Sequence, residues 1–335
     1  MKNNSTRKKK EKNRKKFFIA ILMILFTGVV LTGSTYAWFT ANKTVTVEQI
    51  DVNVAASNGL QVSVDAINWK TVISNDDING AGTTYATAVN QLPEGSIVPT
   101  STVGEIDTTT GFMKMFQGEI SSNAQGNYIL TATQSVEKHG KTSGSFIAFD
   151  LFFQTNQAEK IYLTSNSSVA ALNTSTGIEN SARVAFINEG TVNAGTDASV
   201  AQALKGGTTP VIWEPNYDVH TAAAVKNASD VYGINTTQAG GAKLAYNGVK
   251  ADITSAANVL LNSSDPQFFS AVTPAIATPE TGIPTTAYEK VFDLPAGITK
   301  VRIYMWVEGQ DVDCENNASG GSLSYNLQFS TLEQA

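Results

Sequence analysis

Residues 323–330 read LSYNLQFS, and apolar and polar side chains alternate along them without a break. Leu323, Tyr325, Leu327 and Phe329 fall on one side of an extended chain, because successive side chains of a β-strand point to opposite faces. The polar residues between them fall on the other side. This stretch predicts a strand of an outer sheet, with one row of side chains against a core and the other in water.

Two other stretches carry apolar residues on both faces. Residues 300–307 (KVRIYMWV) are β-branched and aromatic apart from Lys300 and Arg302, and residues 145–153 (SFIAFDLFF) are similar apart from Asp150. Such runs are typical of strands that are buried on both sides. They predict the central strands of the fold.

A hairpin is predicted further toward the N-terminus. Apolar alternation over residues 50–54, and again over 60–64, flanks the turn sequence Ser57-Asn58-Gly59. Asn-Gly between alternating runs is the strongest short hairpin signal. We therefore expect these two segments to pair with each other.

Other short segments suit strands, and long amphipathic helices are not evident in the sequence. Strands are expected at residues 128–136, 160–164, 183–188, 211–214 and 289–294, and short helices at 198–204 and 255–261. Many short strands without helical crossovers predict an all-β protein, an antiparallel β-sandwich of the jelly-roll or immunoglobulin-like sort, and we favour the jelly roll. We expect a single domain over 38–335, with a loop-rich insertion at about 190–285, where Ala, Gly, Thr and Asn dominate.

The chain opens with the three parts of an export signal. Residues 2–16 hold nine Lys or Arg and one Glu, residues 17–31 are apolar, and residues 32–37 are small and end in Ala37. The apolar run fits the roughly 7 to 15 residues of a signal peptide better than the roughly 20 of a membrane span. We predict a signal peptide over 1–37. A retained N-terminal anchor is the alternative.

The charge balance limits the kinds of partner that this chain is expected to bind. Beyond residue 16, 14 basic and 28 acidic residues are left. A chain this acidic is not expected to bind nucleic acid or anionic lipid through charge, and we expect contact with the membrane only through the N-terminal segment before cleavage. Cys314 is the single cysteine, so no internal disulfide can form. These features fit a protein secreted by a Gram-positive-type bacterium.

The junction Thr35-Tyr36-Ala37-Trp38-Phe39-Thr40 lies between the apolar leader and a Val-rich segment. It resembles the export signal of proteins processed by the signal peptidase SipW, a family that includes TasA biofilm-matrix fibre proteins and camelysin-like proteins. The resemblance covers residues 7–64 and the all-β character. It implies a jelly-roll domain, deposition at the cell surface or in the extracellular matrix, and fibres in which the N-terminal segment of one subunit completes the sheet of the next.

The segment after the junction contains a break in its alternation. Val45 and Val47 share one face, and the apolar frame resumes at Ile50 after a slip at Glu48-Gln49. Such a slip predicts a β-bulge or a change of partner sheet. Our hypothesis is that residues 39–47 are a detachable strand that pairs with a neighbouring subunit. The alternatives are an ordinary first strand within its own sandwich and a loose end.

Camelysin-like proteins have been classed as metallopeptidases, which raises the question of a zinc site. His139 and His220 lie outside any H-E-x-x-H pattern and have no G-x-S-x-G motif to partner. We expect both histidines to be surface residues and Cys314 to be a packed, unreactive thiol. The sequence predicts no enzyme, no catalytic residue and no cofactor, although a pair of glycosidase-type carboxylates stays open because their spacing is spatial.

Two acidic loops are candidate calcium sites, because hard cations prefer clustered oxygen ligands. One is residues 308–317 (EGQDVDCENN), directly after the strand at 300–307. The other is residues 74–80 (SNDDING), which mimics the start of an EF-hand loop but has Ala86 in place of the bidentate carboxylate. Solvated turns are the alternative for both, because Asp and Asn suit turns.

Together these features predict a secreted structural protein of the cell surface or extracellular matrix, with the signal peptidase as its export partner. Self-association, or association with other matrix proteins, is expected, and fibres formed by N-terminal strand exchange would be one form of it. The alternative is a surface binding module, an adhesin or glycan-binding protein, that uses the 190–285 loops. Trp213, Tyr217 and Tyr232 would suit sugar stacking there, although Trp213 also suits the core.

Overall fold

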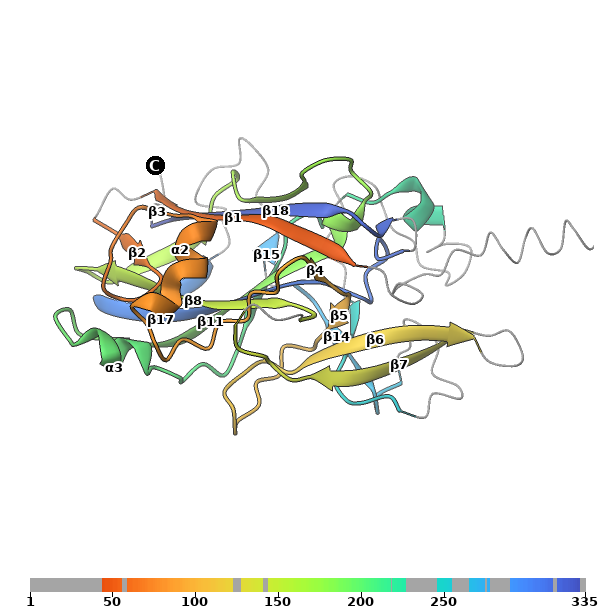
Figure 1. Cartoon of the computed structure of the whole chain (residues 1–335), viewed down its shortest axis with the longest axis horizontal. Coiled ribbons are helices and arrows are strands. Elements are labelled where there is room, and N and C mark those ends of the chain that lie inside the picture. The colour runs from red at the N-terminus through yellow and green to blue at the C-terminus, as the bar shows by residue number, and fades with distance from the viewer. Residues whose placement is uncertain are drawn as a thin grey trace, which may run out of the picture.

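The computed structural model describes residues 44–55, 59–122, 128–140, 144–217, 219–226, 246–254, 265–274, 276–277, 290–315 and 318–331. Within them the chain is an all-β sandwich, as the sequence predicts, with two large sheets packed face to face and two small sheets beside them (Figure 1). The predicted signal peptide lies outside the described residues. No helix in the described part is long and apolar enough to span a membrane.

Sheet A contains the first and last strands of the described chain. Its strands are β1 (Val45–Ala55), β3 (Val72–Ile73), β4 (Ser96–Ile97), β9 (Glu159–Leu163), β10 (Ser168–Ala171), β16 (Lys290–Leu294) and β18 (Ser322–Ser330). The order is β16-β9-β18-β1-β3, with β10 also paired to β18 and β4 to β1. β1 and β18 run parallel through nine Cα pairs, whereas the other pairs of this sheet are antiparallel.

Sheet B contains the strands that the sequence predicts to be central. Its strands are β2 (Gln61–Ser63), β8 (Ile147–Thr155), β11 (Ala182–Val192), β12 (Val211–Glu214), β15 (Ile276–Ala277) and β17 (Gly297–Val307). The order is β15-β12-β11-β17-β8-β2, so β17 and β8 both have a neighbour on each side. The prediction that these two strands are central is confirmed.

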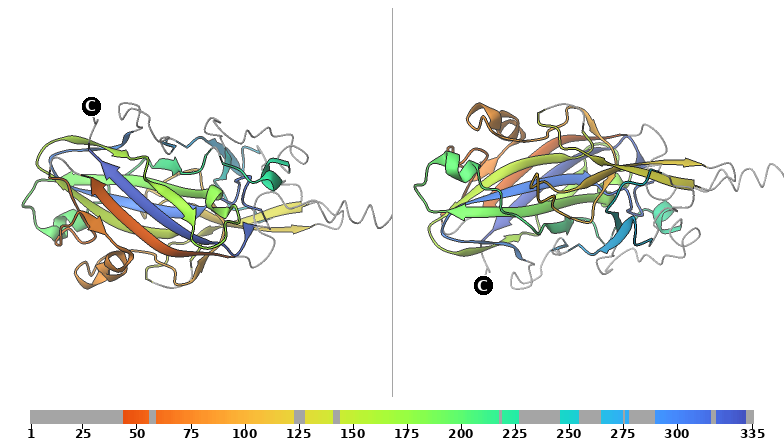
Figure 2. Two further views of the ribbon diagram at one scale, coloured as in Figure 1. Left: turned by 90° about the horizontal axis from the view of Figure 1, so that it is seen from above. Right: turned by 90° about the horizontal axis from the view of Figure 1, so that it is seen from below.

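The main core lies between the two sheets. The apolar row of β18 faces sheet B, and its last member, Phe329, packs edge-on against Phe153 of β8 and Phe186 of β11, with ring centroids 5.3 and 5.7 Å apart. The polar residues between them stay partly accessible on the outer face of sheet A, which is seen from above in the left view of Figure 2. The alternation of residues 323–330 therefore predicts this strand correctly. The strand order does not by itself establish a jelly roll, which stays a prediction.

A third layer covers the outer face of sheet B. Met113, Met115 and Phe146 pack on Tyr304 and Trp306 of β17. Figure 1 shows the hairpin of β6 (Met115–Ser122) and β7 (Tyr128–Ser135) beneath sheet B. The other elements outside the large sheets are β5 (Thr100–Ser101), β13 (Tyr246–Val249), β14 (Phe269–Val272), α2 (Asn75–Gly80), α3 (Ala198–Gln202) and the 3₁₀ helices η1 (Ala81–Thr83) and η2 (Ile178–Ser181).

The first strand contains the predicted irregularity. Val47 pairs with Leu323 and Gln49 with Ser324, so Glu48 is an extra residue, a β-bulge in the seam with β18. On its other edge, β1 pairs with β4 before the bulge and with β3 after it. The slip in the apolar frame thus marks a bulge and a change of neighbour, as the sequence predicts.

The predicted hairpin between residues 50–54 and 60–64 is wrong. β1 belongs to sheet A, whereas β2 pairs with β8 in sheet B. The two alternating segments belong to different sheets and are buried from opposite sides of the core. Asn-Gly indicates a turn here, but the partner of each strand is set by which core face it covers.

The remaining predicted strands are present, and the segment 190–285 contributes to both large and small sheets. β7, β9, β11, β12 and β16 overlap the predicted segments, and α3 lies within the predicted helix at 198–204. The predicted helix at 255–261 lies outside the described residues. Within 190–285, β12 and β15 belong to sheet B, and β13 and β14 form a sheet of their own.

Candidate functional site

The acidic loop that follows β17 is buried rather than solvated. Glu308, Asp311, Asp313 and Glu315 are each at most 6% exposed. Backbone turns hold the loop compact, since the amide of Asp311 donates to the carbonyl of Glu308 and the amide of Cys314 donates to that of Asp311. The solvated turn expected for residues 308–317 is therefore wrong for the described part of this loop.

Arg183 links this loop to sheet B. It lies at the start of β11, points to the outer face of the sheet and is 1% exposed. One guanidinium nitrogen, Nη2, lies 2.6 Å from Glu214 Oε1 at the end of β12 and 2.5 Å from Asp311 Oδ2. Two carboxylates from distant parts of the chain thus share a single buried cation.

His220 joins the same group and is not the surface residue that the sequence suggests. It is 7% exposed, and its Nδ1 lies 2.6 Å from Asp313 Oδ2. The other oxygen of Asp313 accepts a hydrogen bond of 2.8 Å from the amide of Thr221. Together, Arg183, Glu214, His220 and the four acidic residues of the loop are called the acidic-loop cluster below.

The acidic-loop cluster holds five carboxylates against Arg183 and His220, so its charges do not balance when all the acids are ionised. Burial raises the pKa of Glu214 and that of Glu308 to about 7. Burial alone lowers the pKa of His220, but the hydrogen bond to Asp313 and the surrounding carboxylates outweigh it, and the pKa is raised. The cluster therefore takes up protons near neutral pH.

The geometry of this cluster does not match a metal centre. No group of three or more His, Cys, Asp or Glu side chains among the described residues is arranged to hold a metal ion. Asp311 and Asp313 direct their oxygens at Arg183 and His220, which are the protein's own cations. Calcium binding by this loop stays a prediction from the sequence.

A second buried group surrounds Arg302 in the middle of β17 and is called the Arg302 cluster. Arg302 Nη1 lies 2.8 Å from Asp150 Oδ1 of β8, and its Nη2 contacts Glu137. Lys300 Nζ lies 3.2 Å from the other oxygen of Asp150, which also accepts a 3.0 Å hydrogen bond from the hydroxyl of Tyr85. Burial alone raises the pKa of Asp150, but Arg302 and Lys300 outweigh it and lower the pKa.

The Arg302 cluster attaches the covering residues to sheet B, and the acidic-loop cluster attaches the loop after β17. Tyr85 follows η1 and Glu137 follows β7, whereas Asp150 and Arg302 belong to β8 and β17 of the sheet. Removing one partner of such a buried pair leaves an uncompensated charge, which is strongly destabilising. The Arg302 cluster therefore helps to fix the position of the covering layer, and the residues of both clusters are used in contacts within the chain.

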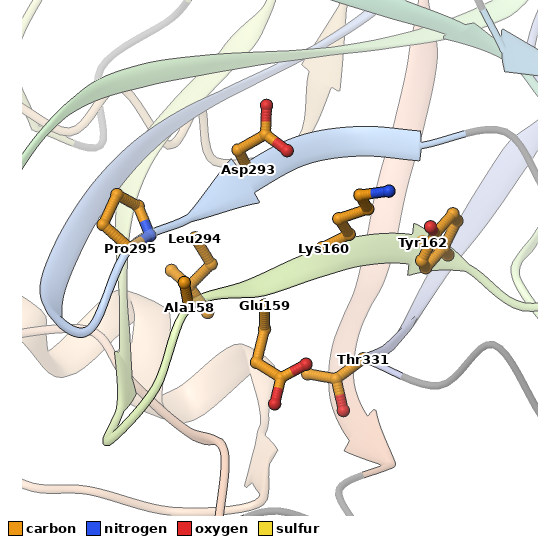
Figure 3. A pocket seen from close by; sticks show the side chains of 8 residues that line it. All are labelled: Ala158, Glu159, Lys160, Tyr162, Asp293, Leu294, Pro295 and Thr331. Carbon is orange, nitrogen blue, oxygen red and sulfur yellow. The ribbon is translucent and has the colours of Figure 1, made fainter.

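An open cavity of about 590 Å³ lies beside β9 (Figure 3). Residues of β16 and the residue after β18 complete its wall. Lys160 and Tyr162 come from β9, and Glu159 extends toward Thr331. Asp293, Leu294 and Pro295 come from β16 and the residue after it, and Ala158 completes the wall. The sequence did not indicate this site, because its residues are common surface types drawn from three distant segments.

The other residues that the sequence suggested as functional candidates lie at different positions in the structure. His139 is exposed, as expected, and its Nδ1 lies 3.1 Å from the carbonyl of Val89. Cys314 is fully buried in the main core, which confirms the packed thiol. Trp213 is also fully buried there, so it cannot stack on a sugar at the surface. Tyr217 is half-buried, and Tyr232 lies outside the described residues.

The loop at residues 74–80 forms helix α2 rather than a solvated turn. Ser74 caps the helix: its hydroxyl accepts from the amide of Asp77, whose carboxylate accepts from the amide of Ser74. Lys70 pairs with Asp77 at 2.5 Å. The Ser-x-x-Asp spacing is a capping-box signal, and it outweighs the likeness to an EF-hand loop.

Comparisons with protein-family models, with curated proteins and with solved structures give no match for this chain. The resemblance of residues 35–40 to SipW-processed proteins therefore stays a prediction from the sequence.

Proposed function

We propose that this chain is a secreted, non-enzymatic structural protein of the bacterial cell surface or extracellular matrix, which self-associates by exchanging β1 between subunits. The predicted signal peptide over 1–37 supports export, and the resemblance at residues 35–40 supports processing by a SipW-type peptidase. Self-association rests on the position of β1, which is the observation that carries the proposal.

β1 is the first described strand and lies inside sheet A. It makes nine Cα pairs with β18, but two with β3 and two with β4. Val45, Ile50, Val52 and Val54 fill the core from this strand. Most of its pairing is thus with the last strand of the chain, and a β1 from an identical neighbour would restore all of these interactions.

Exchange of an identical terminal strand costs little at equilibrium, because the same strand pairing that one subunit gives up forms again between two subunits. Exchange that does not close into a ring generates an open filament. The parallel seam between β1 and β18 supplies both the apolar core packing and a long run of backbone hydrogen bonds. Such a joint suits a fibre that must persist outside a cell.

The test is to fasten β1 to its own subunit. Asn53 and Gln328 are Cα partners across the seam, and both point to the outer face, so the variant Asn53→Cys with Gln328→Cys, called the β1-locked protein, introduces a disulfide there. The protein would start at Trp38 and keep the buried Cys314. We expect fibres by electron microscopy in the unmodified and reduced proteins, and monomers by light scattering in the oxidised one.

A matched disulfide provides the control. Ser168 and Asn326 are Cα partners between β10 and β18, so Ser168→Cys with Asn326→Cys joins two strands without restraining β1. This oxidised control should still assemble. Fibres that form equally well from the oxidised β1-locked protein would contradict strand exchange, and an unmodified protein that stays monomeric at all concentrations would contradict self-association.

A further inference from the structure

The cavity shown in Figure 3 is separate from the β1 seam and from both buried clusters, and the proposed function does not use it. Its volume of about 590 Å³ lies within the range of small-molecule sites. A cavity of this size holds a ligand of a few linked rings.

The walls offer both hydrogen-bond donors and acceptors at close quarters. Lys160 and Tyr162 supply an ammonium group and a phenol hydroxyl, and Glu159 and Asp293 supply carboxylates. Each sugar hydroxyl both donates and accepts, so it can use either kind of group. Leu294 and Pro295 add apolar surface for the C–H faces of a ring.

The donor groups in the wall are open to a ligand. Lys160 lies opposite Asp293 in the strand register, but Asp293 pairs with Lys290 at 2.7 Å, and Lys160 has no ion pair among the described residues. Tyr162 is 6% exposed and lines the cavity, and its hydroxyl has no hydrogen-bond partner within the described part of the chain. A bound hydroxyl could therefore hydrogen-bond to Lys160 or Tyr162 without displacing an ion pair or hydrogen bond between described residues.

The charges around the cavity cancel. Lys160 and Lys290 stand against Glu159 and Asp293, whereas the chain beyond residue 16 has 14 basic and 28 acidic residues. With two charges of each sign, the cavity offers no net charge to attract a polyanion or a polycation. A neutral ligand with many hydroxyl groups does not depend on such attraction.

We infer that this cavity is a binding site for a neutral oligosaccharide, which contacts Lys160 and Tyr162 through its hydroxyl groups and Pro295 through a ring face. The open side of the cavity lets a longer chain continue past it. The site would attach the protein to a neutral surface or matrix polysaccharide, and it does not depend on strand exchange.

The test is calorimetric titration of the mature chain with maltohexaose, cellohexaose and chitohexaose. We expect at least one of them to bind, and Tyr162→Phe and Lys160→Met each to weaken that binding about three- to tenfold, the usual effect of one hydrogen bond. Tyr162→Phe keeps the ring in place, so unchanged thermal melting would show that the fold is intact. Lys70→Met, at an exposed lysine outside the cavity, should bind as the unmodified protein does.

Three results would overturn the inference. They are the absence of binding for all three oligosaccharides at millimolar concentration, equal binding by the two cavity variants and the unmodified protein, and equal loss of binding in Lys70→Met. Light scattering of the same variants separates the alternatives, because a cavity that holds a second copy of the chain would lose self-association in Tyr162→Phe and Lys160→Met. The β1-locked protein should keep its sugar binding, so failure of strand exchange and failure of this site are distinguishable.

Discussion

On the outer face of sheet A, β18 presents Ser324, Asn326 and Gln328 to water, whereas on the outer face of sheet B, β17 presents Lys300 and Arg302 to a covering layer. Both strands carry an apolar row against the same core. The row in water is uncharged, whereas the row under the covering layer contains the charged side chains of Lys300 and Arg302. The difference shows that the partner available to a side chain, and not its polarity alone, decides where it can be buried.

The outer faces of the two sheets also differ in the contacts that they make. Sheet A keeps an open face and contains the β1 seam and the cavity at β9, so the proposed contacts with other molecules lie there. Sheet B uses its outer face within the chain, through the acidic-loop cluster and the Arg302 cluster. Variants on the two faces should therefore differ sharply in their effect on stability.

The largest effect is expected from Arg302→Met. This change leaves Asp150 and Glu137 buried without their shared cation, and breaking such a buried network costs about 3–5 kcal/mol. Gln328→Met is the matched change on the outer face of sheet A, and a surface substitution of this kind stays within about 0.5 kcal/mol. Urea unfolding of both variants measures the difference. Similar midpoints would mean that the Arg302 cluster does not hold the covering layer.

The next effect is a dependence of stability on pH. The pKa of Glu308 is about 7 in the folded chain against an ordinary 4.5, because burial disfavours the charged form. Between these values the folded chain keeps a proton that the unfolded chain loses, so the free energy of unfolding falls as the pH rises from about 4.5 to 7. The fall is on the order of 3 kcal/mol for this shift. The raised pKa of His220 acts in the same direction above its ordinary 6.5.

Glu308→Gln tests this dependence. The amide keeps an acceptor for the indole of Trp306, which donates to Glu308 at 3.0 Å, but it cannot ionise. We expect the melting temperature of the variant to vary less between pH 5 and pH 8 than that of the unmodified protein. Glu214→Gln, with a pKa of about 7 in the folded chain, should act likewise. Unchanged slopes in both variants would contradict proton uptake by the acidic-loop cluster.

Sequence patterns predict which residues of a single strand lie on its buried face and which lie on its accessible face. The alternation at 323–330 and the slip at Glu48 each report on consecutive residues, and both are confirmed as a strand with one buried row and as a bulge. The apolar residues of 300–307 correctly indicate burial on both sides. These features are local, because the spacing of side chains along a strand is fixed by the backbone.

Patterns do not predict which strands meet or which charges pair. The Asn-Gly turn suggests a hairpin, yet β1 pairs with β18, more than 260 residues away in the chain. His220 and the loop at 308–315 look like surface features because Asp, Glu and His usually are, and their burial depends on Arg183 and on one another. Partners of this kind are set by the folded topology, which composition and periodicity do not contain.

The smallest effect is expected on the open face of sheet A. Asn326 accepts a 3.3 Å hydrogen bond from Asn53 and donates one of 3.1 Å to the carbonyl of Asn166. Asn326→Thr removes both, but water can replace them at an accessible position and threonine suits a strand, so we expect a loss of at most about 1 kcal/mol in urea unfolding. A loss above about 2 kcal/mol would mean that this row depends on its polar contacts as sheet B does, and the distinction between the two faces would fail.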